Sequence, residues 1–385
     1  MSAHENNTNK GLFSYQDLKA LLRSRAVASS VDPVTEEQVQ PASIDLRLGA
    51  KAYRLVSSFL PESHGVLERL GDGGGDASDL VMYEIDISEG GILEKGHVYL
   101  IPLMEELDLP AGVRGRANPK STTGRLDVFA RVLSDNNPRF DDIAAGYKGG
   151  LYLEILPRSF AIGVKQGLSL VQLRLMDGDC LVDDADLQEL QETEGILYDG
   201  ESDGLVKGVS IGKGLFMSVD LSGEAMGGII GYRSRKNSHV VDLTKRDYYD
   251  IVDFWEPVRA SKNSTLILEP EEFYILSSME KIRIPTGYAA EMAAYEAGSG
   301  ELRTHYAGFF DPGFGYGSSG EVLGTKAVLE VRAHDVPFMI SHGQTFCKLA
   351  YERMRDVPEK TYGPKIGSSY QFQGITLSKQ FKKPS

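Results

Sequence analysis

The feature that most constrains this 385-residue chain is an internal repeat. Seven residues of the segment 93–112 recur, with identical spacing, in the segment 268–287, which lies 175 positions later. The segment 43–50 matches the segment 218–225 at the same spacing. Past one loop the spacing becomes 176, and the matches are Glu154 with Glu330, Gly167 with Gly343 and Leu173 with Leu349. Matches that keep register over so long a span predict two copies of one domain, fused in tandem.

Each copy has the sequence pattern of a β domain. Short apolar runs such as 98–103, 168–175 and 273–277 lie between turn residues, as strands do in barrels and sandwiches. The 42 glycines suit many tight turns. We therefore predict a mainly β protein, made of two tandem barrel-like or jelly-roll-like domains with a few short helices.

Helices are expected at only a few places. A capping box that begins at Ser14 predicts a helix through about Val27, and an acidic helix is expected at 184–193. A polar stretch punctuated by Gly and Asp, 195–214, is where we place the boundary between the copies. The predicted domains are 1–195 and 205–385.

Composition excludes several classes of function. The formal net charge of −14 argues against a protein that coats nucleic acid, although it leaves room for a small anionic substrate. No apolar run approaches the length of a membrane span, and residues 1–10 lack the apolar core of a secretion signal. Only Cys180 and Cys347 occur, so there is no disulfide framework. We expect a cytoplasmic protein without nucleic-acid or membrane partners.

Two carboxylates stand alone in apolar, strand-like runs. Glu330 lies within the run 327–331, and its repeat counterpart Glu154 lies within 151–155. Burial among apolar side chains disfavours the charged form of Glu and raises its pKa. Such a group suits a reaction in which a proton is taken and returned near neutral pH.

One polar segment has the composition of a phosphate-binding loop. It reads Lys120, Ser121, Thr122, Thr123, Gly124 and Arg125, which gives two cations, three hydroxyls and a flexible position. A solvated hairpin loop is the alternative interpretation. The second copy has Glu296 within the corresponding segment 295–300, and a carboxylate there would repel phosphate.

The second copy carries two other candidate segments. Asp311, Pro312 and Gly313 form a turn before the strand of Glu330, and this turn is expected either to contact a base or sugar or to be an ordinary Pro-Gly turn. The first copy lacks the Asp-Pro pair in its segment 143–149. The polar and aromatic segment 362–374 is expected to close over a ligand or to be a disordered terminus.

Several known site patterns are missing from the sequence. There is no Cys-x-x-Cys and no His-x-Glu, which the zinc-dependent nucleoside deaminases require. There is also no Walker loop and no dinucleotide-binding fingerprint. A nucleotide site in this chain would therefore have to use other chemistry.

Taken together, these segments resemble the dCTP deaminase family, in the long form with two domains of the dUTPase-like β fold. The segments that carry the resemblance are 41–49, 120–125, 311–315, 327–331, 343–344 and 370–374. The resemblance implies hydrolytic deamination of dCTP to dUTP and ammonia, without a catalytic metal. It also implies that Mg²⁺ accompanies the triphosphate without a dedicated protein site.

The resemblance implies a role for individual residues. The Glu that activates water for attack at C4 of cytosine corresponds to Glu330, with Glu154 as its repeat counterpart, and Ser121 and Arg125 correspond to the assisting residues. Lys120 stands where the family usually has Arg, so bidentate phosphate contact is lost. The implied substrate-binding residues are Lys120, Thr122, Thr123, Gly124, Asp311, Gly313, Val328, Leu329, Tyr362, Lys365, Tyr370 and Gln373.

Because each copy has lost a different half of the pattern, we expect a composite site, formed either within one chain or between chains. We also expect a homo-oligomer. The first copy would supply Ser121 and Arg125, and the second would supply Asp311 and Glu330. Two alternatives remain open. One is a dUTP diphosphatase or an enzyme that performs both reactions, and the other is a non-catalytic nucleotide-binding protein.

Overall fold

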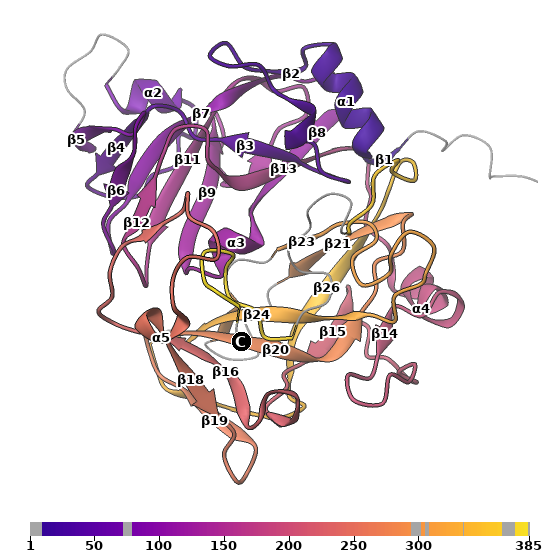
Figure 1. Cartoon of the computed structure of the whole chain (residues 1–385). Coiled ribbons are helices and arrows are strands. Elements are labelled where there is room, and N and C mark those ends of the chain that lie inside the picture. Colours follow the sequence, from indigo (N-terminus) through magenta and orange to yellow (C-terminus); the bar gives the residue numbers. More distant parts are fainter. Residues whose placement is uncertain are drawn as a thin grey trace, which may run out of the picture. The chain divides into compact units, whose positions relative to one another are not determined.

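The computed structural model describes residues 10–71, 79–293, 302–304, 308–333, 335–363 and 374–383 (Figure 1). By its internal contacts the chain divides into two compact units. Unit 1 contains Met1–Cys180 and His239–Arg246, and unit 2 contains Leu181–Ser238 and Asp247–Ser385. Within the described ranges, no helix has both the length and the apolar character needed to cross a membrane.

Unit 1 consists mainly of short strands. Its strands are β1 (Gly11–Leu12), β2 (Val27–Ala28), β3 (Ile44–Arg47), β4 (Lys51–Leu55), β5 (Val81–Asp86), β6 (Gly91–Leu93), β7 (Tyr99–Asp108), β8 (Val113–Pro119), β9 (Val128–Ser134), β10 (Asp142–Ile143), β11 (Lys148–Pro157), β12 (Ile162–Val164), β13 (Ser169–Asp177) and β17 (Val241–Asp242). Its helices are α1 (Tyr15–Arg23), α2 (Val66–Arg69), α3 (Ser121–Gly124) and the 3₁₀ helix η1 (Glu36–Gln38).

Unit 2 has the same character. Its strands are β14 (Leu197–Tyr198), β15 (Leu215–Ser218), β16 (Ile229–Ser234), β18 (Trp255–Arg259), β19 (Thr265–Leu268), β20 (Phe273–Ile282), β21 (Tyr288–Ala293), β22 (Leu302–Thr304), β23 (Phe309–Phe310), β24 (Thr325–Ala333), β25 (Phe338–Ser341) and β26 (Thr345–Arg353). Its helices are α4 (Asp184–Thr193), α5 (Ile251–Phe254) and the 3₁₀ helix η2 (Glu224–Met226).

Each unit is built on two main antiparallel sheets with matching strand orders. In unit 1 the orders are β5-β4-β7-β11-β9 and β1-β13-β8-β10, with β2 paired to β7 and β3 to β13. In unit 2 they are β18-β16-β20-β24-β22 and β15-β26-β21-β23, with β14 paired to β20, and β15 corresponds to β3 of unit 1 and not to β1. The prediction of a duplicated, mainly β fold with few short helices is therefore confirmed.

The two long central strands of each unit keep the register that the repeat predicts. Glu154 on β11 lies opposite Leu100 on β7, and Glu330 on β24 lies opposite Ile275 on β20. A second contact repeats at the same spacing, because the hydroxyl of a buried tyrosine accepts a backbone N–H in both units. The two bonds are Glu94 N–H to Tyr99 (3.0 Å) and Glu269 N–H to Tyr274 (3.2 Å).

At the start of the repeat the predicted register is wrong by four residues. Glu105 accepts the backbone N–H of Arg47 at 2.7 Å, and its counterpart Glu280 accepts that of Ser218 at 2.9 Å. The two partners are 58 residues apart in the first copy and 62 in the second. A longer connection in the second copy therefore displaces the true match, and the similarity of 43–50 to 218–225 is not structural equivalence.

Helices α1 and α4 occupy equivalent places at the start of each unit. The Ser14 N–H donates to Asp17 at 3.0 Å, as the predicted capping box requires. However, α1 ends at Arg23 and not near Val27, because Arg25 adopts a φ of 64° and the chain then pairs with β7 as β2. Helix α4 covers the predicted residues and leads into β14 in the same way.

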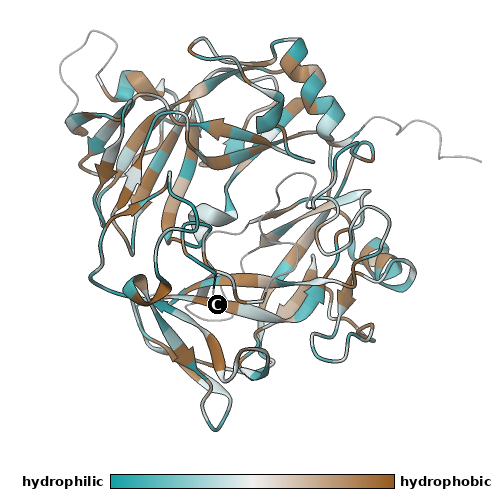
Figure 2. Ribbon diagram, viewed as in Figure 1, coloured by the Kyte–Doolittle hydropathy of each residue, from teal (hydrophilic) through white to brown (hydrophobic). Residues whose placement is uncertain are grey.

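The core contacts assign α4 to unit 2. Leu187 and Leu190 of this helix belong to the same buried cluster as Leu215 of β15 and Leu329 of β24. The domain boundary predicted from the sequence, at residue 195, places this helix at the end of the first domain. Figure 2 shows hydrophobic residues along the strands of both units.

A segment of the second repeat is part of unit 1. Strand β17 lies parallel to β12, and the Val241 and Leu243 N–H groups donate to Ala161 and Gly163 at 3.0 and 2.9 Å. A Cβ atom on Gly163 would lie 3.3 Å from Cα of Asp242, so glycine permits the close approach. The sequence did not indicate this exchange.

Substitution of the two equivalent glutamates, Glu105 and Glu280, should affect stability unequally. Glu105 is fully buried and accepts from the Arg47 guanidinium at 2.7 Å and from Gln38 at 2.9 Å, whereas Glu280 bonds only neutral donors of Ser218 among the contacts described. Breaking a buried ion pair costs about 3–5 kcal/mol, and a neutral hydrogen bond about 1 kcal/mol. Glu105→Gln should therefore lower the calorimetric unfolding temperature more than Glu280→Gln does. Equal losses would contradict this account of the two sites.

Candidate active site

The two candidate carboxylates are buried at equivalent positions in the central strands. Glu154 is 2% exposed and Glu330 is 7% exposed. On β24 the neighbours Leu329 and Val331 point into the core of unit 2. Because side chains alternate along a strand, Glu330 points to the opposite face of the sheet, together with Val328.

Glu154 is held in an ion pair. Arg131 lies directly across from it on β9, and its Nη2 atom is 2.5 Å from Oε1 of Glu154. The guanidinium of Arg131 also lies 3.6 Å from the ring centre of Phe140. This combination of a charge-assisted bond and a cation–π contact holds the carboxylate in one place.

The predicted phosphate-binding segment forms a short helix and not an open loop. Lys120 precedes α3, and its ammonium pairs with Asp45. The Thr123 hydroxyl is buried and donates to the carbonyl of Leu170 at 2.7 Å, which is a structural role. Gly124 and Arg125 are also buried, whereas Ser121 and Thr122 are half-buried. Ser121 and Thr122 are therefore the most accessible hydroxyl groups of the segment.

The Asp311 turn is formed as predicted, and its backbone is tightly held. The Phe314 N–H donates to the Asp311 carbonyl at 3.0 Å, and the Gly313 N–H donates to the Ile284 carbonyl at 2.9 Å. Gly313 has a φ of 95°, which favours glycine. The side chain of Asp311 is largely buried.

The first repeat has the same turn without the acidic residue. There the Tyr147 N–H donates to the Ala144 carbonyl at 3.1 Å, and the Tyr147 carbonyl accepts from Leu109, just as the Phe314 carbonyl accepts from Ile284. Ala144 therefore occupies the place of Asp311.

The start of the predicted closing segment contacts this turn. The Tyr362 N–H donates to the Pro312 carbonyl at 2.8 Å, and the Tyr362 ring lies 5.3 Å from that of Phe314. Three further predicted residues of this segment, Lys365, Tyr370 and Gln373, lie outside the described residues, as does 295–300. Unit 2 thus contains Asp311, Gly313, Val328, Leu329, Glu330 and Tyr362, and unit 1 contains Glu154 and the segment 120–125.

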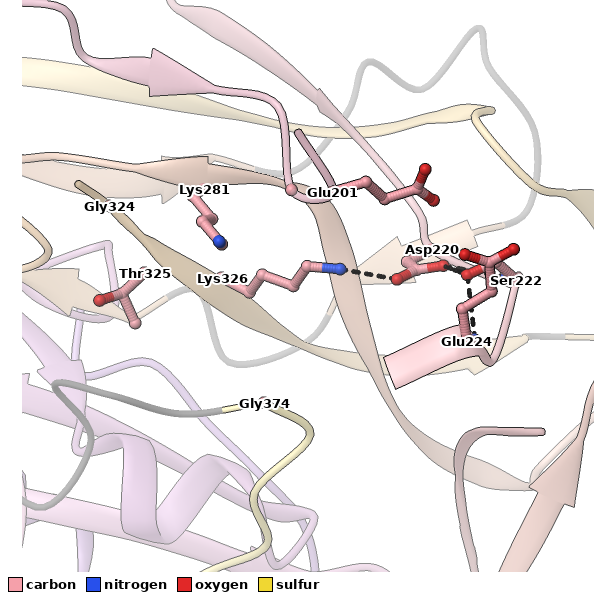
Figure 3. A pocket seen from close by; sticks show the side chains of 10 residues that line it. Glu201, Asp220, Ser222, Glu224, Lys281, Gly324, Thr325, Lys326 and Gly374 are labelled. Atoms are coloured by element: carbon pink, nitrogen blue, oxygen red, sulfur yellow. Dashed lines mark hydrogen bonds and ion pairs between the residues drawn. The ribbon is translucent and has the colours of Figure 1, made fainter. Parts of the chain in front are cut away.

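Unit 2 also has a pocket that sequence reasoning missed. It has a volume of about 460 Å³, and its walls include Asp220, Ser222, Lys281, Thr325, Lys326 and Gly374 (Figure 3). Lys281 and Lys326 lie directly opposite each other on β20 and β24, where the first repeat has Glu106 and Gly150. A comparison of the two repeats at these positions could have revealed the pocket from the sequence.

Both lysines of this pocket are paired with carboxylates. Lys326 Nζ lies 2.7 Å from Oδ2 of Asp220, and Lys281 pairs with Asp203. Burial alone would raise the pKa of Asp220, but hydrogen bonds from Lys326 and Ser222 hold that pKa below its usual range. Among the residues that the structure describes, no three His, Cys, Asp or Glu side chains form a metal-binding group.

Comparison with known proteins covers both halves of the chain. The model of the 2'-deoxycytidine 5'-triphosphate deaminase N-terminal domain matches residues 9–179, and the model of the C-terminal domain matches residues 183–381. A solved structure of 2'-deoxycytidine 5'-triphosphate deaminase from Agrobacterium tumefaciens is 44% identical, with a TM-score of 0.82. The match covers 90% of this chain and 99% of that chain.

Curated relatives match over shorter stretches. A "dCTP deaminase, dUMP-forming" from Methanobrevibacter smithii is 28% identical over 34% of this chain and 65% of its own length. A "dCTP deaminase" from Sulfurisphaera tokodaii is 25% identical over 41% of this chain and 75% of its own length. With both of its halves matched by the family models and the fold shared along almost its whole length, this chain belongs to the 2'-deoxycytidine 5'-triphosphate deaminase family.

Proposed function

We propose that this chain hydrolyses dCTP to dUTP and ammonia, with Glu330 as the general base and acid. The observation that carries the proposal is the second repeat, where a buried carboxylate on a central strand and the Asp311 turn occur in one unit. The family membership supplies the substrate class, because the relatives and the solved structure are named for deamination of dCTP.

In this mechanism Glu330 takes a proton from a water molecule while the oxygen of that water attacks C4 of cytosine. The carboxyl delivers this proton to N3, then takes the proton of the new C4 hydroxyl and passes it to the amino group. The C4–N bond breaks, ammonia leaves, and the C4 oxygen becomes the carbonyl of uracil. General acid–base catalysis of this type contributes about 10²–10⁴-fold.

Ser121 and Arg125 complete the site from the first repeat. The half-buried hydroxyl of Ser121 and the cation of Arg125, four residues later in the sequence, are groups that suit the stabilisation of the attacking water and of charge on the ring. Lys120, Thr122 and the backbone of Gly124 would contact the triphosphate, and Mg²⁺ would accompany it as a counter-ion. The complementary losses in the two repeats support a composite site, formed either within one chain or between the chains of a homo-oligomer.

Two alternatives are kept. Several relatives are named as dUMP-forming, which favours testing an enzyme that also removes pyrophosphate. A non-catalytic nucleotide-binding protein is the other alternative, since duplication and decay can produce one.

The two glutamates should differ in their effect on catalysis. Glu330→Gln removes the proton carrier at nearly constant shape and should lower kcat for dCTP by about 10²–10⁴-fold. Glu154→Gln should keep kcat within about twofold and lower the unfolding temperature, because Arg131 loses its ionic partner. The measurement is ammonia release, with circular dichroism to verify folding. Loss of activity in Glu154→Gln alone would reverse the assignment.

The products distinguish the proposed reaction from its alternatives. With dCTP as substrate, we expect one ammonia per dUTP formed and no pyrophosphate, measured by coupled assays and chromatography. Ammonia together with pyrophosphate would identify the bifunctional enzyme, and pyrophosphate from dUTP alone would identify a diphosphatase. Tight dCTP binding with neither product would support the non-catalytic alternative.

Metal removal tests the proposed water activation by a carboxylate. After dialysis against a chelator, adding Mg²⁺ should restore full activity, because the ion would act only on the triphosphate. Added Zn²⁺ should give no further increase. Activity that zinc restores and magnesium does not would overturn the proposed mechanism.

A further inference from the structure

The second repeat has an additional loop next to the Asp311 turn. Seven positions separate Tyr147 from Glu154 in the first repeat, and sixteen separate their counterparts Phe314 and Glu330, so nine residues have been added. The additional residues are 316–324. The Gly324 N–H donates to the Gly315 carbonyl at 3.0 Å, so the two ends of the loop meet at the base of β24.

The loop has internal structure of its own. The carboxylate of Glu321 accepts the backbone N–H groups of Ser318 at 3.1 Å and Ser319 at 2.8 Å. The bond from Ser319 is the main reason why the pKa of Glu321 falls to about 2. The loop is therefore a compact turn structure, closed by an ionised side chain at neutral pH.

Arg283 attaches this loop to α4. Its Nη2 atom donates to the Gly320 carbonyl at 2.9 Å, and its Nη1 atom donates to the carbonyls of Glu194 and Gly195 at 2.7 and 3.0 Å. The guanidinium also lies 4.6 Å from the ring centre of Tyr316, and the residue is only 5% exposed. A cation at the C-terminal carbonyls of a helix is favourable, and a planar fork can bridge two segments.

The next residue along the chain holds the Asp311 turn itself. The Ile284 N–H donates to the Phe314 carbonyl at 2.8 Å, and the Ile284 carbonyl accepts the Gly313 N–H at 2.9 Å. Arg283 thus holds the added loop with its side chain, and Ile284 holds the turn with its backbone.

The first repeat keeps the backbone bond and lacks the side-chain bridge. The residue equivalent to Arg283 is Asp108, which pairs at the surface with Lys148, 2.7 Å away. The bond from Leu109 N–H to the Tyr147 carbonyl, 3.0 Å long, corresponds to that from Ile284. The arginine, the added loop and Asp311 therefore occur together, in the repeat that carries Glu330.

We propose that Arg283 is a positioning residue, which fixes the added loop against α4 and so sets the nucleoside-binding turn at Asp311. The inference rests on the proposed function, which assigns Asp311 to the nucleoside. Glu330 is held separately, by its ladder with β20, so it stays in place when the loop is released. Looser binding of substrate and transition state alike raises KM and leaves kcat unchanged.

Two substitutions of Arg283 distinguish a role in positioning the turn from a role in folding. Arg283→Met removes both halves of the bridge, and Arg283→Lys keeps a cation for the α4 carbonyls but cannot span to Gly320. Both should raise KM for dCTP about tenfold with kcat within about twofold, because the turn is expected to bind substrate and transition state equally. Arg283→Lys should unfold close to the wild-type temperature. The matched control is Arg353→Lys, which makes the same change at another arginine that contacts α4. Arg353 does so through Asp186, 2.5 Å away.

A loop excision tests whether Arg283 acts through the loop. Deleting 316–323 joins Gly315 to Gly324, whose backbones already meet, and should raise KM as Arg283→Met does. The two changes combined should raise KM no further, because they remove one interaction. Unchanged KM in both Arg283 variants, additive effects, or a fall in kcat at constant KM would overturn the proposal.

Binding measurements keep this test independent of catalysis. Calorimetric titration of Glu330→Gln with dCTP, with and without Arg283→Met, should show a similar tenfold loss of affinity. Amides in 316–324 should exchange faster with solvent in Arg283→Met. Absence of ammonia from the wild type would reject the proposed function, and unchanged affinity and exchange would reject the role of Arg283.

Discussion

The ladder between the two long central strands is the constraint on which each unit depends. In both repeats it places a glutamate opposite an apolar residue of the neighbouring strand, with core side chains on either side in the sequence. A slip of one residue would turn every side chain of the strand to the other face. The position of the carboxylate is therefore fixed by backbone pairing, and evolution could change its surroundings without moving it.

The two repeats have used that freedom differently. In the first, Arg131 across the ladder binds Glu154, and the turn carries Ala144 where the second repeat has Asp311. In the second, the turn is acidic and is flanked by an added loop that Arg283 bridges to a helix. A shared framework thus carries an ion-paired glutamate in one unit, and an acidic turn with an added loop in the other.

Much of this could be predicted from sequence, because it follows from local patterns. The β character, helix α4 and the burial of Glu154 and Glu330 come from periodicity and from repeat spacing, and the structure agrees. The register at 43–50 could not be predicted. The connection that follows this segment is four residues longer in the second copy, and a chance similarity at the wrong spacing concealed the difference. The bridge by Arg283 was also hidden, because its three carbonyl partners carry no side-chain signal in the sequence.

The exchanged strand β17 has a consequence for how the chain can be divided. It covers the edge of β12, whose backbone groups would otherwise lie open to another strand. A fragment ending at Cys180 would contain nearly all of the first repeat and still lack this cover. Open strand edges recruit other chains, so such a fragment should associate with itself.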